Sequence, residues 1–176
     1  LNLIPSLTDG RIADVRDELY WEIVEPVPGQ FSWPANYERY MSALKDAGIN
    51  PLIELTFENS HYDGGQTPYT DAGIAAYAHY ATSLLAHYPQ IKTLEVWNEY
   101  NGSFAKGPAT QDRAGTYTRM LRATYAAVTA LRPAVTVVGG ATAGVPLPYL
   151  EKIFAAGGLA KLDAVSIHPY RTHFSP

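Results

Sequence analysis

Short apolar runs alternate with longer amphipathic segments along the chain. One run, residues 135–140, is apolar on both faces, as buried parallel strands are. The amphipathic segments carry apolar residues three and four positions apart, which predicts helices. We expect strands within residues 12–19, 52–57, 91–99, 135–140 and 162–168.

This alternation predicts an α/β fold in which βαβ units form a parallel sheet. Residues 1–176 contain no linker, so a single domain is expected. With 47% hydrophobic and 17% charged residues, the composition is that of a globular protein. No apolar run approaches the roughly 20 residues that span a bilayer, so no membrane partner is expected. The chain starts without Met or a basic leader, and its start is expected to be processed or truncated.

Several chemistries find no support in the composition. The chain has no Cys, and therefore no disulfide, thiolate nucleophile or Cys-ligated metal. Its His residues lack the spacing of a zinc site, and it has no glycine-rich nucleotide-binding motif, so neither a metal nor a cofactor is expected. A net charge of −4 with scattered basic residues argues against a nucleic-acid partner.

The apolar stretch at 91–101 ends in an amide, a carboxylate and a turn. Asn98 and Glu99 precede an Asn-Gly turn, so we expect them at the C-terminal tip of a strand, where parallel sheets and barrels bind ligands. Strand alternation places Glu95, Trp97 and Glu99 on one face and Asn98 on the other. Glu95 is expected to be a buried structural carboxylate. A Glu at a strand end is most often a solvated charge or half of an ion pair, so position alone does not establish catalysis.

The sequence Trp-Asn-Glu-Tyr-Asn at 97–101 resembles the acid/base strand of clan A glycoside hydrolases, (β/α)8 barrels that cleave glycosidic bonds with retention. Within that clan it is most similar to families 39 and 5. Residues 16–21, 25–26 and 29–33 resemble the second strand and following loop of family-39-like enzymes. The resemblance implies an incomplete (β/α)8 barrel of about five parallel strands. It would comprise strands two to six, without the first strand and the last two βα units.

The resemblance also implies roles for individual residues in a retaining glycoside hydrolase that acts on O-glycosidic bonds of an oligo- or polysaccharide. Glu99 would be the general acid/base, and Asn98 would bind the sugar 2-hydroxyl. Arg16 would keep the nucleophile ionised, and His168 and Tyr170 would line the sugar subsite. Arg16 as an ion-pair residue and His168 as a core histidine are the alternatives. Further substrate-binding candidates are Trp97 and His61.

A retaining glycosidase needs a second carboxylate, about 5–5.5 Å from the acid, as its nucleophile. In the family this is a Glu at the tip of strand seven, which the predicted strands do not include. The second carboxylate must then come from this chain or from another copy of it. Glu58, after the neighbouring strand, is the preferred internal candidate over Glu18, Glu22 and Glu25. Otherwise the chain is a catalytically silent barrel remnant that binds carbohydrate or self-associates, and this alternative stays open.

Length leads to a prediction about assembly. A complete barrel takes about 200 residues at least, so 176 residues are expected to leave two sheet edges open. One edge is the strand within 162–168, which is apolar and has no following helix. Such edges promote association, so we predict a homodimer or higher homo-oligomer with carbohydrate as its substrate. The family resemblance favours a secreted or periplasmic location.

Overall fold

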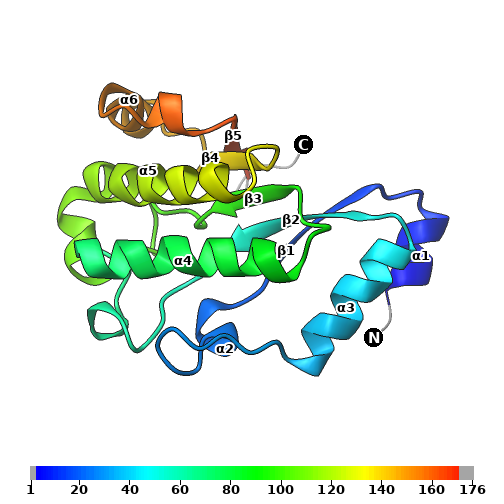
Figure 1. Cartoon of the computed structure of the whole chain (residues 1–176). Coiled ribbons are helices and arrows are strands. Elements are labelled where there is room, and N and C mark those ends of the chain that lie inside the picture. Colours follow the sequence, from blue (N-terminus) through cyan, green and yellow to red (C-terminus); the bar gives the residue numbers. More distant parts are fainter. Residues whose placement is uncertain (1–2, 171–176) are drawn as a thin grey trace.

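The computed structural model describes residues 3–170 and contains one curved parallel sheet. Its five strands lie in sequence order and each neighbouring pair is parallel, which makes a curled half-barrel (Figure 1). The predicted incomplete TIM-type barrel is therefore confirmed. The strands are β1 Asp14–Glu18, β2 Asn50–Leu55, β3 Thr93–Val96, β4 Thr136–Ala143 and β5 Ala164–His168.

One helix or more connects each strand to the next, and α4 and α5 lie side by side across the sheet (Figure 1). The long connecting helices are α3 Ala35–Asp46, α4 Asp71–His87, α5 Arg113–Leu131 and α6 Leu147–Ala155. The short helices are α1 Ile4–Asp9 and α2 Trp21–Val24, and the 3-10 segments are η1 Asp63–Gly65, η2 Gly107–Asp112 and η3 Gly158–Lys161. None of the helices within residues 3–170 is long and apolar enough to cross a membrane.

Side-chain caps fix where the two longest helices begin. The Thr70 hydroxyl accepts a hydrogen bond from the backbone N–H of Gly73 at 3.0 Å, which makes Thr70 the N-cap of α4. Asp112 caps α5 in the same way through the N–H of Gly115, also at 3.0 Å. Both caps satisfy helix N–H groups that otherwise have no partner.

Buried tyrosines of α4 and α5 hold the end of β3 in place. The Tyr77 hydroxyl donates to the carbonyl of Leu55 at 2.7 Å and accepts from the N–H of Trp97 at 3.1 Å. The Tyr117 hydroxyl donates to the carbonyl of Val96 at 3.1 Å. These hydroxyls satisfy backbone groups at the point where the regular strand stops, so the core itself positions the residues that follow β3.

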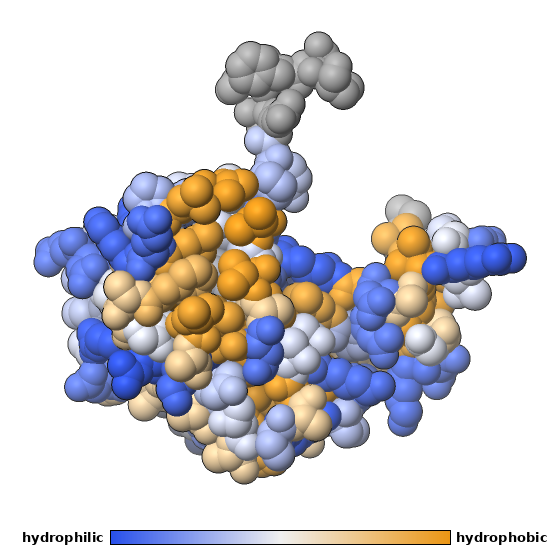
Figure 2. Space-filling model, turned by 90° about the horizontal axis from the view of Figure 1, so that it is seen from above, coloured by the Kyte–Doolittle hydropathy of each residue, from blue (hydrophilic) through white to orange (hydrophobic). Residues whose placement is uncertain are grey.

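Both outer strands have an open edge. Within the described residues, β1 pairs only with β2, and β5 pairs only with β4. Val165 and Ile167 of β5 are 43% and 40% exposed. Apolar side chains also gather on the face around α6 and β5, which is seen from above in Figure 2. The exposed apolar residues of this end are Val145, Leu147, Leu159, Val165 and Ile167.

Candidate active site

A row of glutamates crosses three neighbouring strands at their carboxyl ends. Glu18 of β1 is paired in register with Glu54 of β2, which is paired in register with Glu95 of β3. Residues in register on parallel strands point to the same face of the sheet, so these carboxylates lie side by side. Glu54 is 3% exposed and Glu95 is 1% exposed. We call these three residues the glutamate row.

Arg16 joins the glutamate row to the tip of β3. Its Nε lies 2.5 Å from Oε2 of Glu95, and its Nη2 contacts the carboxylate of Glu54. The same Nη2 donates to Oδ1 of Asn98 at 3.1 Å. Arg16 is therefore an ion-pair residue in this structure. Glu95 is a buried carboxylate paired with Arg16, as predicted.

The environment of Glu54 favours its neutral form. Burial is the main cause, and the charges of Glu95, Glu18 and Glu99 add to it against the opposing effect of Arg16, so that the pKa of Glu54 rises to about 8. At neutral pH Glu54 is then mostly protonated. Arg16 therefore mainly compensates the charge of Glu95 rather than that of two ionised neighbours.

Glu99 and His168 bring the tips of β3 and β5 together. Nδ1 of His168 lies 2.9 Å from Oε1 of Glu99, and both side chains are mostly buried, at 12% and 22% exposure respectively. The ring of Tyr170 lies 6.3 Å from that of His168, centroid to centroid, and Tyr170 is 79% exposed. The geometry therefore places an oriented carboxylate beside an imidazole and an accessible aromatic ring.

Strand alternation fails at the end of β3. The regular strand ends at Val96, and Trp97 and Glu99 have positive φ angles of 67° and 44°. These conformations turn the chain out of the pleat, so the prediction that Asn98 faces away from Glu95 is wrong: Arg16 contacts both.

Trp97 is also placed differently from the expectation of a sugar contact. Its ring has no exposed surface and packs against Phe57, Tyr77 and Tyr100. A completely buried ring cannot touch a substrate in this conformation. Trp97 instead serves as packing beneath the residues at the strand tip.

A pocket of about 410 Å³ opens over the glutamate row. Arg16, Glu54 and Asn98 line it together with aromatic rings, and we call it the Arg16 pocket. Sequence reasoning missed the contributions of Glu54, Tyr20 and Phe104. A Glu inside the mostly apolar run at 52–57 is the available signal for Glu54.

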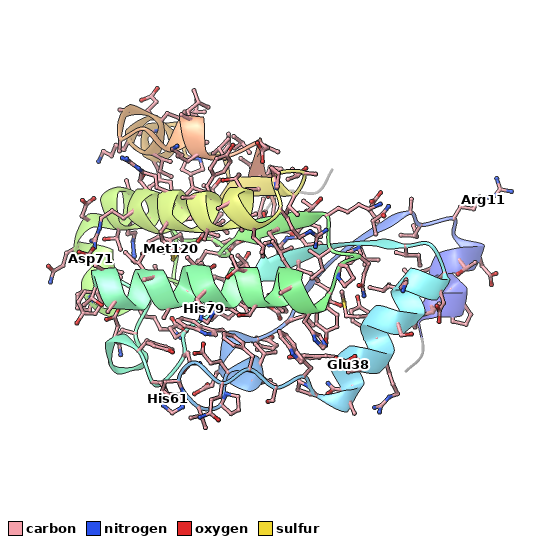
Figure 3. The ribbon with its side chains drawn as sticks, in the orientation of Figure 1. Arg11, Glu38, His61, Asp71, His79 and Met120 are labelled. Atoms are coloured by element: carbon pink, nitrogen blue, oxygen red, sulfur yellow. The ribbon has the colours of Figure 1, made fainter. Side chains whose placement is uncertain are left out.

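The structure does not bring Glu58 and His61 into the Arg16 pocket. Glu58 lines a neighbouring pocket and forms an ion pair with Lys106 at 3.3 Å. Nε2 of His61 lies 2.9 Å from the carbonyl oxygen of Pro26, a contact that joins two loops. Figure 3 shows His61 at the bottom of the molecule near α2, whereas α6 and β5 lie at the top.

No group of three or more His, Asp or Glu side chains within residues 3–170 has the arrangement of a metal site. Within the glutamate row, Arg16 pairs with Glu95, and Glu54 is mostly protonated at neutral pH.

A half-barrel with polar side chains at the carboxyl ends of its strands belongs to the class of TIM-type α/β barrels. Comparison of the sequence with family models and with curated proteins gave no match. Comparison of the structure gave clear matches, among them three glycoside hydrolases.

The resemblance to family 39 is confirmed at the level of the fold. A family 39 glycoside hydrolase from Bacteroides cellulosilyticus has a TM-score of 0.80 at 24% identity, over 97% of this chain and 35% of that one. A β-xylosidase from Caulobacter crescentus has a TM-score of 0.68 at 24% identity, and the match covers 94% of this chain and 37% of the β-xylosidase. The GH39 enzyme from Xanthomonas axonopodis has a TM-score of 0.66 at 20% identity, and the match covers 94% of this chain and 36% of that enzyme. The chain thus spans about a third of the length of these structures.

Proposed function

We propose that the chain carries the acid/base half of a retaining glycoside hydrolase site, which acts on O-glycosidic bonds of an oligo- or polysaccharide. The supporting observation is the pair of contacts at the tip of β3. His168 lies 2.9 Å from the Glu99 carboxylate, and Arg16 donates to the Asn98 side chain at 3.1 Å. Adjacent residues thus present an oriented acid and an oriented amide at the end of the barrel where substrates bind.

Glu99 acts first as the acid and then as the base. Its protonated carboxyl donates to the glycosidic oxygen as the bond to the leaving group breaks, and the carboxylate later takes a proton from the attacking water. When Nδ1 of His168 carries a proton, it donates to Oε1 of Glu99. Oε2 is then the oxygen that carries the catalytic proton.

Asn98 presents hydrogen-bond donors to the sugar. Arg16 has only donors, so Oδ1 of Asn98 must face Arg16 and the amide nitrogen faces away from it. In the Arg16 pocket that nitrogen is free to donate to a sugar hydroxyl. The hydrogen bond to the 2-hydroxyl strengthens as the oxocarbenium-like transition state forms.

A retaining mechanism also needs a second carboxylate as the nucleophile. Glu58 accepts from the Thr67 hydroxyl at 3.2 Å through one oxygen and pairs with Lys106 through the other. Glu58 lines the neighbouring pocket rather than the Arg16 pocket, which favours a binding role over nucleophilic attack, and Glu54 is mostly neutral at pH 7. We therefore propose that another copy of the chain supplies the nucleophile.

A catalytically silent carbohydrate-binding or self-associating chain is the second candidate. The observation that favours it is Arg16, which is engaged by Glu95, Glu54 and Asn98 rather than by a catalytic nucleophile. Self-association would proceed through the open β5 edge, where Val165 and Ile167 are exposed.

Hydrolysis of aryl β-xylosides and β-glucosides by wild type and Glu99→Gln tests the role of Glu99. Loss of an acid affects poor leaving groups, because only they need protonation, so we expect a drop of about 10²-fold or more for these and a smaller one for activated leaving groups. Glu151→Gln, an exposed carboxylate on α6, is the matched control. Equal losses on both substrate types would rule out the acid role. A wild type that binds xylobiose but hydrolyses none of the substrates would favour the silent alternative.

A further inference from the structure

A second, larger pocket adjoins the Arg16 pocket. Its volume is about 570 Å³, within the range of about 300–1,000 Å³ that is usual for ligand sites. Tyr20 and Phe57 line both pockets, so the two share an aromatic wall. The loops after β1, β2 and β3 form the second pocket, and Lys106 and Glu58 supply its charges. We call it the Lys106 pocket.

A buried threonine arranges the charged groups of the Lys106 pocket. The Thr67 hydroxyl donates to Oε1 of Glu58 at 3.2 Å and accepts from the backbone N–H of Lys106 at 2.8 Å. Nζ of Lys106 completes the set at 3.3 Å from Oε2 of Glu58. Thr67 itself has no exposed surface. One buried hydroxyl therefore binds both the Glu58 carboxylate and the Lys106 backbone, and the ion pair joins the two side chains.

The charged pair retains hydrogen-bonding capacity toward a ligand. The Lys106 side chain is 58% exposed, and its ammonium group has three donors, of which Glu58 uses one. The Glu58 carboxylate has lone pairs beyond those used by Thr67 and Lys106. Because the two charges cancel, the pair suits a neutral ligand with several hydroxyl groups better than an ionic one.

The aromatic wall supplies the matching apolar surface. The rings of Phe57 and Phe104 stack at 5.4 Å, and the ring of Tyr20 lies 6.4 Å from that of Phe57. Tyr20 is 38% exposed. An aromatic surface next to a donor and an acceptor matches a pyranose, which has an apolar C–H face and a rim of hydroxyls.

We propose that the Lys106 pocket is a subsite for a second, neutral sugar unit of the glycan whose first unit occupies the Arg16 pocket. This inference rests on the proposed function. The shared wall of Tyr20 and Phe57 lets one glycan chain run from one pocket into the other. The chain then prefers substrates of two or more sugar units over a monosaccharide.

Calorimetric titration of the full chain with xylose, xylobiose and xylotriose, and with glucose, cellobiose and cellotriose, tests the subsite. Wild type should bind a disaccharide about tenfold more tightly than the monosaccharide, as one hydrogen bond to a charged group allows. Lys106→Met should reduce this gain to about twofold or less and leave monosaccharide binding unchanged. Lys152→Met, an exposed lysine on α6, is the matched control and should keep the full gain.

A chemical measurement on wild type avoids dependence on the variant's folding. Xylobiose or cellobiose should slow the acetylation of Lys106 by an amine-reactive ester, measured by mass spectrometry, whereas the monosaccharides should not. Lys152 should react at the same rate throughout. Equal acetylation of Lys106 with and without a disaccharide would overturn the subsite.

The outcomes separate the subsite from the proposed function. Monosaccharide binding that Asn98→Ala abolishes, with no gain from a second unit, would overturn the subsite and leave the proposed function standing. The absence of binding for every sugar would overturn both. If Lys106→Met lowers the melting temperature but still binds the disaccharide about tenfold more tightly than the monosaccharide, the ion pair only joins the loops. The proposal of a second subsite is then wrong.

Discussion

Glu54 should make the stability of the protein depend on pH in a defined direction. Its pKa is raised from 4.5 to about 8, chiefly by burial, so the folded state holds a proton that the unfolded state has lost between these pH values. Stability is therefore fully present below about pH 4.5 and falls as pH rises through about 8. Glu54→Gln keeps a neutral side chain of the same shape and removes this titration.

The expected magnitude follows from the size of the pKa change. A rise from 4.5 to about 8 corresponds to about 5 kcal/mol at about 1.4 kcal/mol per pH unit. The Arg16 pocket is open to water and the Arg16 side chain is 41% exposed, so screening reduces the effect, and we expect about 2–5 kcal/mol.

Urea denaturation of wild type and Glu54→Gln at a series of pH values from about 5 to 9 provides the measurement. The two proteins should have similar stability at the acid end, where Glu54 is protonated. The glutamine variant should be the more stable at the alkaline end. Glu151→Gln should follow wild type at every pH, because Glu151 is exposed. Parallel curves for wild type and Glu54→Gln would refute the reasoning.

Other parts of the structure give further measurable outcomes. Arg16→Met leaves Glu95 buried without its cation, so denaturation at pH 7 should show a loss of about 3 kcal/mol, and an unchanged midpoint would contradict this. Thr70→Ala removes the cap of α4 and should cost about 1 kcal/mol, whereas Thr70→Ser should retain most of the stability. If copies associate through β5, light scattering at micromolar concentration should give at least a dimer for wild type and a smaller species for Val165→Lys. A monomeric wild type would exclude this mode of assembly.

The sequence predicted the sheet well because its signals are local. Apolar runs separated by amphipathic segments are enough to place strands and helices, and each expected strand overlaps an observed one. The cap at Thr70 is equally predictable, since Thr is one of the residue types that helices prefer at the N-cap and Thr70 directly precedes an amphipathic run.

The glutamate row was not predicted as a unit because it depends on register. Glu18, Glu54 and Glu95 lie far apart in sequence, and only the pairing of β1, β2 and β3 brings them together. The contacts of Glu58 could not be predicted for the same reason, because they depend on how distant segments meet in the fold. Its position after β2 was clear, but its partners come from Thr67 and Lys106 in other loops.

The irregular backbone after Val96 explains both the main error and the site. A regular strand would alternate its side chains, and Asn98 would then face away from Glu95 and Arg16. Positive φ at Trp97 and Glu99 is unfavourable for these residue types and persists only where the surroundings impose it. Tyr77 binds the N–H of Trp97, which is one such constraint. The departure from strand geometry is therefore what places Asn98 beside Arg16 and Glu99 beside His168.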